Sequence, residues 1–202
     1  MREIVKTLCE VAGPSGEERQ VAEVLKSLLR DFAFSVETDP LGNLIVKLNE
    51  PKSDKPVLLL DAHFDEIGFM VTEILDGGFL RLSCCGGIDR RCIAGSFVTV
   101  LGKERLDGIV CSLPPHLRGE KDPSVPGKES VYLDCGRSKD ELSDRVHVGD
   151  RCIFKPHFTQ LLGDKISCKS LDNRAGCAVL VRIAQLIREA NGECPFQVVL
   201  LF

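Results

Sequence analysis

A histidine and three acidic residues are concentrated in the stretch Asp61–Glu66, directly after the apolar run Val57–Leu60. Such a continuous apolar run is typical of a strand that is buried on both faces. In open α/β sheets, ligands bind outside the carboxyl ends of the strands, which is where His63, Asp65 and Glu66 are expected. His63 and Asp65 are two positions apart, so their side chains share one side of an extended chain. Asp65 could then orient an imidazole whose other nitrogen binds a metal ion. A structural histidine satisfied by a neighbouring carboxylate is an equally good interpretation.

A second polar cluster, Ser170–Gly176, stands just before a helix that is predicted to begin near Arg174. The simplest interpretation is that Asp172 or Asn173 is the N-cap of this helix. A carboxylate at a helix start can also bridge two cations, and the distance to His63 would decide between the two interpretations.

The sequence offers no nucleophilic triad. No G-x-S-x-G motif occurs, and Ser15 is better explained as a helix cap. The remaining histidines, His116, His147 and His157, have no partner pattern, so we interpret them as surface or loop residues.

The ends of the chain are predicted to form an α/β domain. Helical spacing of apolar residues predicts one helix in the first ten residues and a second one to about Arg30, with Ser15 and Glu18 as its capping box. Three strands follow from the patterns: a hairpin of Phe34–Thr38 with Leu44–Leu48, and Val57–Ala62. Further along, a helix from Arg174 to a C-cap at Asn191–Gly192 and a strand at Gln197–Phe202 complete the list.

The middle of the chain has a different character. Short strand patterns alternate with Gly-containing turns, which predicts a small all-β unit inserted between the two pieces of the α/β domain. The expected strands are Phe69–Ile74, Phe79–Ser83, Phe97–Leu101, Leu106–Cys111, Val131–Asp134 and Arg151–Phe154, with a loop at Leu117–Glu129 and a short helix at Lys139–Val146.

Composition excludes several classes of function. The 202 residues are 44% hydrophobic with a net charge of −4, one Tyr and no Trp, so neither a basic patch nor an aromatic platform for nucleic acid is expected. No apolar run approaches the roughly 20 residues of a membrane span. The N-terminus is too polar for a secretory leader, so we expect a cytoplasmic protein without membrane partners. The ten cysteines show no CxxC pair and fall in apolar segments, including Cys92, Cys111, Cys152, Cys168 and Cys177, which predicts reduced, buried thiols.

Taken together, the motifs resemble the tetrahedral, or glutamyl/deblocking, aminopeptidase family of dinuclear metallopeptidases. The resemblance spans nearly the whole chain. It is carried by Gly13–Glu18, Asp39–Asn43, His63–Gly68, Pro114–His116, Val148–Asp150 and Leu171–Arg174.

The resemblance implies a three-layer αβα metallo-exopeptidase-like domain, incomplete here, formed by residues 1–68 and 160–202. Residues 69–159 match the inserted all-β dimerisation domain, so a homo-oligomer is expected. His63 matches a metal ligand, Asp172 a carboxylate that bridges two divalent ions, and Asp65 the acid that orients the histidine. Zinc or cobalt suits such ligands best, and manganese is compatible with them. The implied reaction is release of N-terminal residues from peptides.

The chain departs from the family pattern after Phe202. The family's Glu-Glu pair, which supplies the general base and a ligand, and two later ligands have no counterpart here. We therefore expect a fragment or the product of a split gene that holds at most one metal ion weakly and does not hydrolyse peptides alone. The alternatives are a non-catalytic assembly partner of full-length relatives, or another hydrolase on the same scaffold, such as a deacylase or cellulase.

Overall fold

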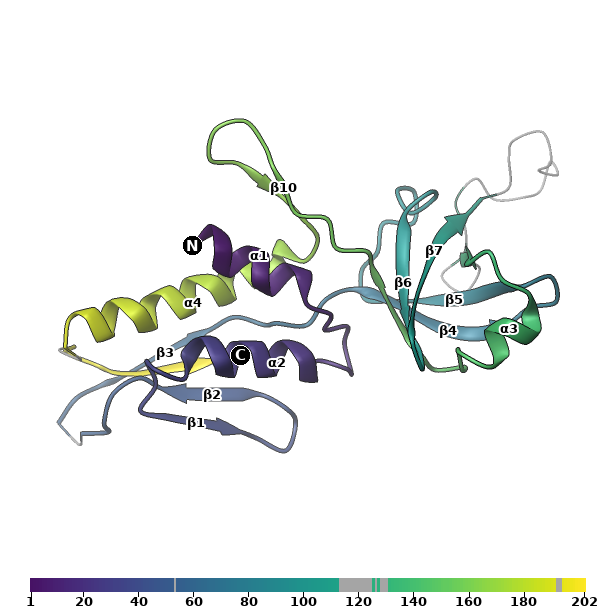
Figure 1. The fold of residues 1–202 in the computed structure, drawn as a ribbon. Coiled ribbons are helices and arrows are strands. Elements are labelled where there is room, and N and C mark those ends of the chain that lie inside the picture. Colours follow the sequence, from purple (N-terminus) through teal and green to yellow (C-terminus); the bar gives the residue numbers. More distant parts are fainter. Residues whose placement is uncertain (53, 113–124, 126, 128–130, 192–193) are drawn as a thin grey trace. The chain divides into compact units, whose positions relative to one another are not determined.

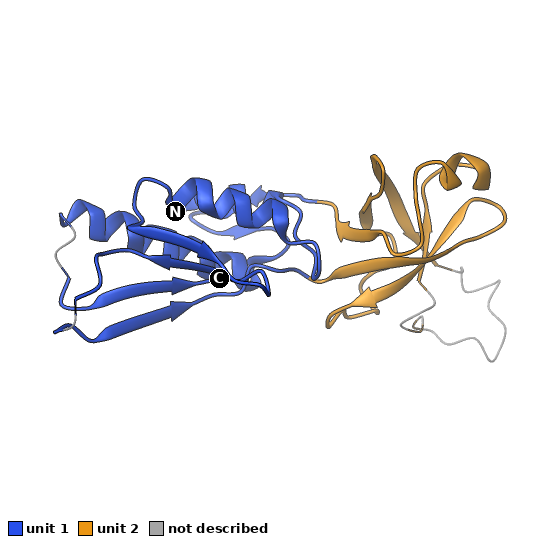
Figure 2. Cartoon of the chain, turned by 90° about the horizontal axis from the view of Figure 1, so that it is seen from below, with its two compact units in different colours: residues 1–66, 156–202 blue, residues 67–155 orange. Residues whose placement is uncertain are grey.

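A computed structural model gives the fold of the chain and describes residues 1–52, 54–112, 125, 127, 131–191 and 194–202 (Figure 1). The chain divides into two compact units, one of residues 1–66 and 156–202 and the other of residues 67–155 (Figure 2). Most of the predicted loop 117–129 lies outside the described residues, as do the Pro114–His116 motif and Gly192.

Unit 1 contains the predicted helices, each with one buried apolar face. They are α1 (Arg2–Glu10), α2 (Arg19–Leu29) and α4 (Leu171–Glu189). The predicted capping box of α2 is wrong. The N-cap of α2 is Glu18, and its side chain makes no capping bond. Ser15, the predicted cap, donates its hydroxyl to Asp65. The predicted C-cap of α4 at Asn191–Gly192 is displaced, because α4 ends at Glu189 with Ala190 as its C-cap. Asn191 follows in the left-handed region, at φ 56°.

The sheet of unit 1 has the order β1-β2-β12-β3. Its strands are β1 (Ser35–Thr38), β2 (Leu44–Lys47), β12 (Gln197–Leu201) and β3 (Val57–Asp61). The predicted hairpin is confirmed as the antiparallel pair β1–β2. The last strand, β12, lies between β2, to which it is antiparallel, and β3, to which it is parallel.

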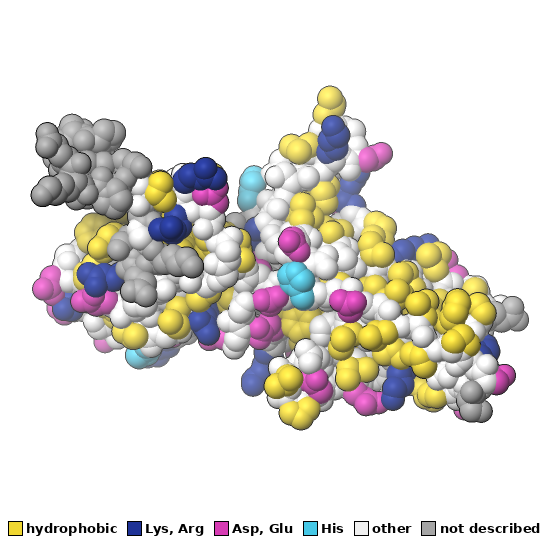
Figure 3. Space-filling model, turned by 180° about the vertical axis from the view of Figure 1, so that it is seen from behind, with side chains coloured by type: hydrophobic (Ala, Val, Ile, Leu, Met, Phe, Trp, Pro, Cys, Tyr) yellow, Lys and Arg dark blue, Asp and Glu magenta, His cyan; other side chains and the backbone are white. Residues whose placement is uncertain are grey.

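The two faces of this sheet differ. Leu44, Val46, Val198 and Leu200 are buried in a core with the three helices, which lie together on one side of the strands (Figure 2). On β3, Val57–Leu60 was predicted to be buried on both faces, and this is wrong. β3 is at the edge of the described sheet and no described helix covers its other face, so Leu59 is 54% exposed. Hydrophobic side chains gather over this unit in the view from behind (Figure 3). The described part therefore has two layers, and a third layer stays a prediction.

Unit 2 is built on a closed barrel with the strand order β4-β5-β8-β7-β6-β9. Alternate residues such as Phe69, Val71, Leu80 and Leu82 point into its core. The strands confirm all six predicted segments: β4 (Gly68–Ile74), β5 (Phe79–Cys85), β6 (Phe97–Leu101), β7 (Arg105–Cys111), β8 (Val131–Asp134) and β9 (Arg151–Phe154).

A short helix in unit 2, α3 (Lys139–Ser143), confirms another prediction, although it ends three residues earlier than expected. Here a capping box does form. The Ser138 hydroxyl accepts from the backbone N–H of Glu141, and the Glu141 carboxylate accepts from the backbone N–H of Ser138. The expected dimerisation role of residues 69–159 stays a prediction.

A small hairpin in unit 1, β10 (Thr159–Gln160) with β11 (Ile166–Ser167), was not predicted. All ten cysteines are described and none is joined in a disulfide, as expected. Their predicted burial is only partly right, because Cys92 is exposed while Cys152 and Cys177 are buried. In the described part of the chain, no helix combines the length and apolar character needed to cross a bilayer.

Candidate metal centre

His63 lies just beyond the carboxyl end of β3, and its orientation is fixed by Asp65. The imidazole Nδ1 is 2.9 Å from Asp65 Oδ1, and the Ser15 hydroxyl donates to the other oxygen of Asp65. Partial burial raises the pKa of Asp65, but the hydrogen bonds from Ser15 and His63 outweigh this effect and hold the pKa below its usual value. Asp65 is therefore an ionised acceptor, which favours the His63 tautomer that carries its proton on Nδ1.

Asp172 comes from the start of α4, 109 positions further along the chain, and meets the same imidazole. The Asp172 Oδ1 is 3.2 Å from His63 Nε2. The predicted N-cap, Asp172 or Asn173, is wrong, because the N-cap of α4 is Ser170, which makes no side-chain capping bond. The Asn173 side chain accepts from the backbone N–H of Gly176 at 3.1 Å within the first turns of the helix. The Asp172 side chain is 97% exposed and remains available to a ligand.

The contact between His63 and Asp172 requires a positive charge between them. With its proton on Nδ1, the imidazole presents a lone pair at Nε2, and the carboxylate presents another. Two lone pairs at 3.2 Å repel each other unless a proton or a metal ion lies between them. Tetrahedral zinc, with bonds of about 2.0–2.1 Å, holds neighbouring ligand atoms about 3.3 Å apart, so the observed separation fits a shared ion.

The donor set also fits a divalent transition metal. Imidazole nitrogen and carboxylate oxygen are ligands of zinc, cobalt and manganese. Among the described residues, no cluster of three or more His, Cys, Asp or Glu side chains with metal-binding geometry occurs. His63 and Asp172 are thus two candidate ligands of an incomplete set. His147 and His157 are exposed, as was predicted for them.

The two loops that carry His63 and Asp172 are joined by Glu66, whose side chain is only 2% exposed. One carboxylate oxygen accepts from the backbone N–H of Gly13 at 3.0 Å. The other accepts from the Lys169 ammonium and the Ser170 hydroxyl. Because Lys169 and Ser170 directly precede the Asp172 turn, a single buried carboxylate connects three segments of the chain.

Arg174 completes this buried network. Its guanidinium is fully buried, lies 3.8 Å from the Glu66 carboxylate and donates to the backbone carbonyl of Leu8 at 2.5 Å. Burial lowers the pKa of both Arg174 and Lys169, and the charge of Glu66 opposes this shift. The close packing requires a glycine at position 13, because a Cβ there would lie 2.6 Å from the Arg174 guanidinium.

Sequence reasoning missed Ser15, Lys169 and Arg174. Ser15 matched a capping box, and nothing local shows that its hydroxyl is used 50 positions away by Asp65. Lys169 and Arg174 look like ordinary surface charges in a polar stretch. The one usable indication was that both residues are close to Asp172 in the sequence. A charged side chain that is buried beside such a site requires a partner of opposite charge.

Comparison with known proteins shows the family to which the chain belongs. Residues 42–202 match the model of the M42 glutamyl aminopeptidase family. The chain belongs to this family. Lysyl aminopeptidase of Pyrococcus furiosus is 32% identical over 199 residues, covering 95% of this chain and 56% of the relative. The TET1 peptidase of Pyrococcus horikoshii, whose structure is described as a tetrahedron or a large octahedral shell, is 37% identical with a TM-score of 0.84, covering 99% of this chain and 59% of that one.

A third similar structure has a different description. An endoglucanase of Thermotoga maritima is 31% identical with a TM-score of 0.80, covering 98% of this chain and 58% of that one. The M42 membership confirms the resemblance on which the sequence interpretation rests. The chain spans between 51% and 58% of the length of the curated relatives it matches.

Replacing Glu66 by Gln is expected to destabilise unit 1 by roughly 3–5 kcal/mol, because it leaves Lys169 and Arg174 buried without a counter-charge. Urea unfolding followed by circular dichroism measures the change. The matched control is Glu37→Gln, which removes an exposed ion pair with Lys47 and is expected to cost less than about 1 kcal/mol. Equal, small effects of the two substitutions would show that the Glu66 network does not hold the loops together.

Proposed function

We propose that this chain is part of a metal-dependent aminopeptidase that releases N-terminal residues from peptides. The observation that carries the proposal is the convergence of His63 Nε2 and the Asp172 carboxylate at 3.2 Å, with Asp65 on the other imidazole nitrogen. Membership of the M42 family, whose relatives are named aminopeptidases, supports the reaction class.

In this proposal each residue has a defined task. His63 and Asp172 would hold the divalent metal, with Asp172 in the role of the shared carboxylate. Asp65 is a positioning residue, which keeps the Nδ1 proton of His63 in place and leaves Nε2 free for a metal. Divalent ions, when bound, supply an activated water and polarise the scissile carbonyl. Ser15 in turn holds Asp65, so the ligand geometry depends on a residue that touches no metal.

Among the residues that the structure describes, His63 and Asp172 are the two candidate ligands, which is fewer than a dinuclear site needs. We therefore propose that this polypeptide alone holds at most one ion weakly and does not cleave peptides. The complete activity would depend on ligands and a general base from outside the described residues. Zinc and cobalt are the proposed ions, with manganese as an alternative.

The test measures metal binding and cleavage together. After mild dialysis, the metal content of the wild-type 202-residue chain is expected to exceed that of His63→Ala several-fold, because the substitution removes one of two ligands. His157→Ala, which removes an exposed histidine outside the site, is the matched control and is expected to keep the wild-type content. With zinc, cobalt or manganese added, the 202-residue chain is expected to leave aminoacyl p-nitroanilides uncleaved.

Two results would contradict the proposal. Equal metal content in wild type and His63→Ala would remove His63 from the site, and cleavage by the 202-residue chain would show that it needs no further ligands. Carboxymethylcellulose and acylated amino acids, added as parallel substrates to the whole protein, test the alternative hydrolase functions. The endoglucanase description of one similar structure is what motivates the cellulose substrate.

The barrel of unit 2 is proposed as the surface through which copies of the chain associate. Phe97, Ile109, Asp134 and Phe79 are paired in one row across strands β6, β7, β8 and β5. The three apolar members of this row are 38–57% exposed. A row of exposed apolar side chains on an ordered barrel is typical of an interface. The similar structures described as a dodecamer and as a tetrahedral or octahedral shell support the proposal, as does the family resemblance.

A cytoplasmic location also stays a prediction, which cell fractionation would test.

Replacing Phe97 by Lys is expected to shift the chain toward monomer, because a charge would be buried at the proposed interface. Light scattering coupled to size-exclusion chromatography measures the mass of the particle. Leu162→Lys, which adds the same charge at a 95% exposed position of unit 1, is the control and is expected to leave the mass unchanged. A wild-type monomer, or a Phe97→Lys variant of unchanged mass, would refute this interface.

A further inference from the structure

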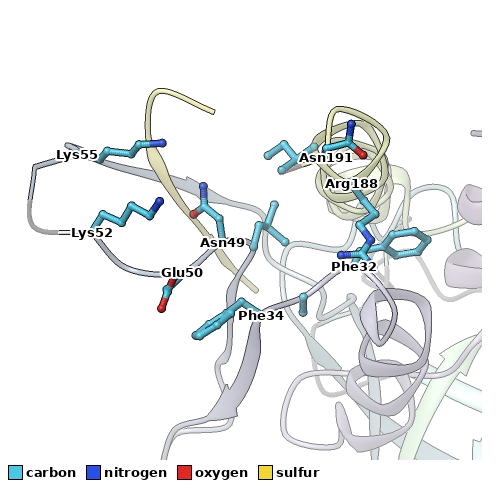
Figure 4. Close-up of a pocket in the computed structure, with 11 residues that line it drawn as sticks. Phe32, Phe34, Asn49, Glu50, Lys52, Lys55, Arg188 and Asn191 are labelled. Carbon is cyan, nitrogen blue, oxygen red and sulfur yellow. The ribbon is translucent and has the colours of Figure 1, made fainter. Parts of the chain in front are cut away.

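A pocket of about 450 Å³ lies in unit 1, at the end of the sheet opposite to His63 (Figure 4). The turn before β3 forms one wall and the last turn of α4 forms the other. Phe32, Phe34 and Leu48 add apolar side chains to the lining, with the Phe32 ring beside Arg188 (Figure 4). A volume of this size is in the range of pockets that bind small molecules.

The first wall presents two ammonium groups, those of Lys52 and Lys55. The backbone N–H of Lys55 donates to the carbonyl of Lys52 at 3.2 Å, which closes the turn. The Gln197 side-chain amide donates to both of these carbonyls, at 2.7 Å for that of Lys55. In addition, the Lys55 ammonium donates to the carbonyl of Cys194 at 2.6 Å. These bonds restrain Lys52 and Lys55 before any ligand arrives, which reduces the entropy lost on binding.

The second wall adds a guanidinium and an amide. Arg188 runs from α4 toward the ring of Phe32, and Asn191 follows it at the end of the helix (Figure 4). Phe34, at the base of the pocket, is 58% exposed and offers an aromatic face beside the charges. Guanidinium and aromatic groups placed together bind flat anionic molecules through ion pairing and stacking.

Among the described residues that line the pocket, positive charges are in excess. They are Lys52, Lys55 and Arg188, against the acid Glu50, whose carboxylate points away from the two ammonium groups (Figure 4). Neither Lys52 nor Arg188 has an ion-pair partner among the residues that the structure describes. The carboxyl end of α4 contributes a partial negative charge of about half a unit, which is smaller than the excess of full positive charges.

We propose that this pocket binds a small organic anion that carries a flat apolar group. The anionic group would lie between Lys52, Lys55 and Arg188, and the apolar group against Phe32 and Phe34. The pocket is separate from the candidate metal centre, because Asp172 and Arg188 stand at opposite ends of α4, roughly 20–25 Å apart at 1.5 Å per residue. The inference does not depend on the proposed peptidase function.

Isothermal titration calorimetry with phenyl phosphate tests the proposal. The buffer contains EDTA, so that no metal at His63 can bind the phosphate. Phenyl phosphate is expected to bind the wild-type chain more tightly than inorganic phosphate or phenol. Inorganic phosphate lacks the aromatic ring, and phenol lacks the anionic group. The double variant Lys52→Gln/Arg188→Gln is expected to bind at least about tenfold more weakly, because two charge-assisted contacts are lost.

Two further variants complete the design. Phe34→Ala, at an exposed position, is expected to reduce the affinity for phenyl phosphate while leaving that for inorganic phosphate unchanged. Arg19→Gln removes one exposed positive charge at the far end of α2 and is the matched control, expected to bind as wild type does. Absence of measurable binding by the wild type, unchanged binding by the double variant, or an equal loss in Arg19→Gln would each overturn the proposal.

Discussion

The buried carboxylate of Glu66 is the constraint on which the candidate site depends. It belongs to the same loop as His63 and Asp65, and its oxygens accept hydrogen bonds from the Gly13 amide, the Lys169 ammonium and the Ser170 hydroxyl. A carboxylate with so little access to water is tolerated only when such partners surround it. The bonds that satisfy Glu66 therefore also fix the relative positions of three chain segments that are far apart in sequence.

The ligand geometry follows from this junction. Ser170 is two positions before Asp172, so holding Ser170 against Glu66 brings the Asp172 carboxylate to the imidazole of His63. The sheet positions His63, because β3 ends just before this residue and pairs in parallel with β12, whose Val198 and Leu200 are buried in the unit 1 core. A network that includes neither of these two side chains thus decides whether the candidate ligands His63 and Asp172 meet. Rigid support of this kind is what a metal site requires if its ligands are to be held in place before the ion binds.

Much of the fold could be predicted from local patterns, and the network could not. Alternating and helical apolar spacing identified the β1–β2 hairpin, all six barrel strands and the main helices, because these elements follow from nearest-neighbour periodicity. Ser15 shows where this reasoning fails. Its spacing to Glu18 fits a capping box, but a hydrogen bond to the distant Asp65 takes its place. Burial on both faces of β3 was also wrong, since it depends on which elements cover the sheet and not on the strand itself.

The most direct test of the account is a crystal structure of the chain soaked in zinc or cobalt, with anomalous diffraction recorded at the absorption edge of the metal. The account predicts an anomalous peak within bonding distance of both His63 Nε2 and an Asp172 oxygen, with Asp65 still on Nδ1. A peak that touches neither residue, or one that binds them at separate places, would contradict it.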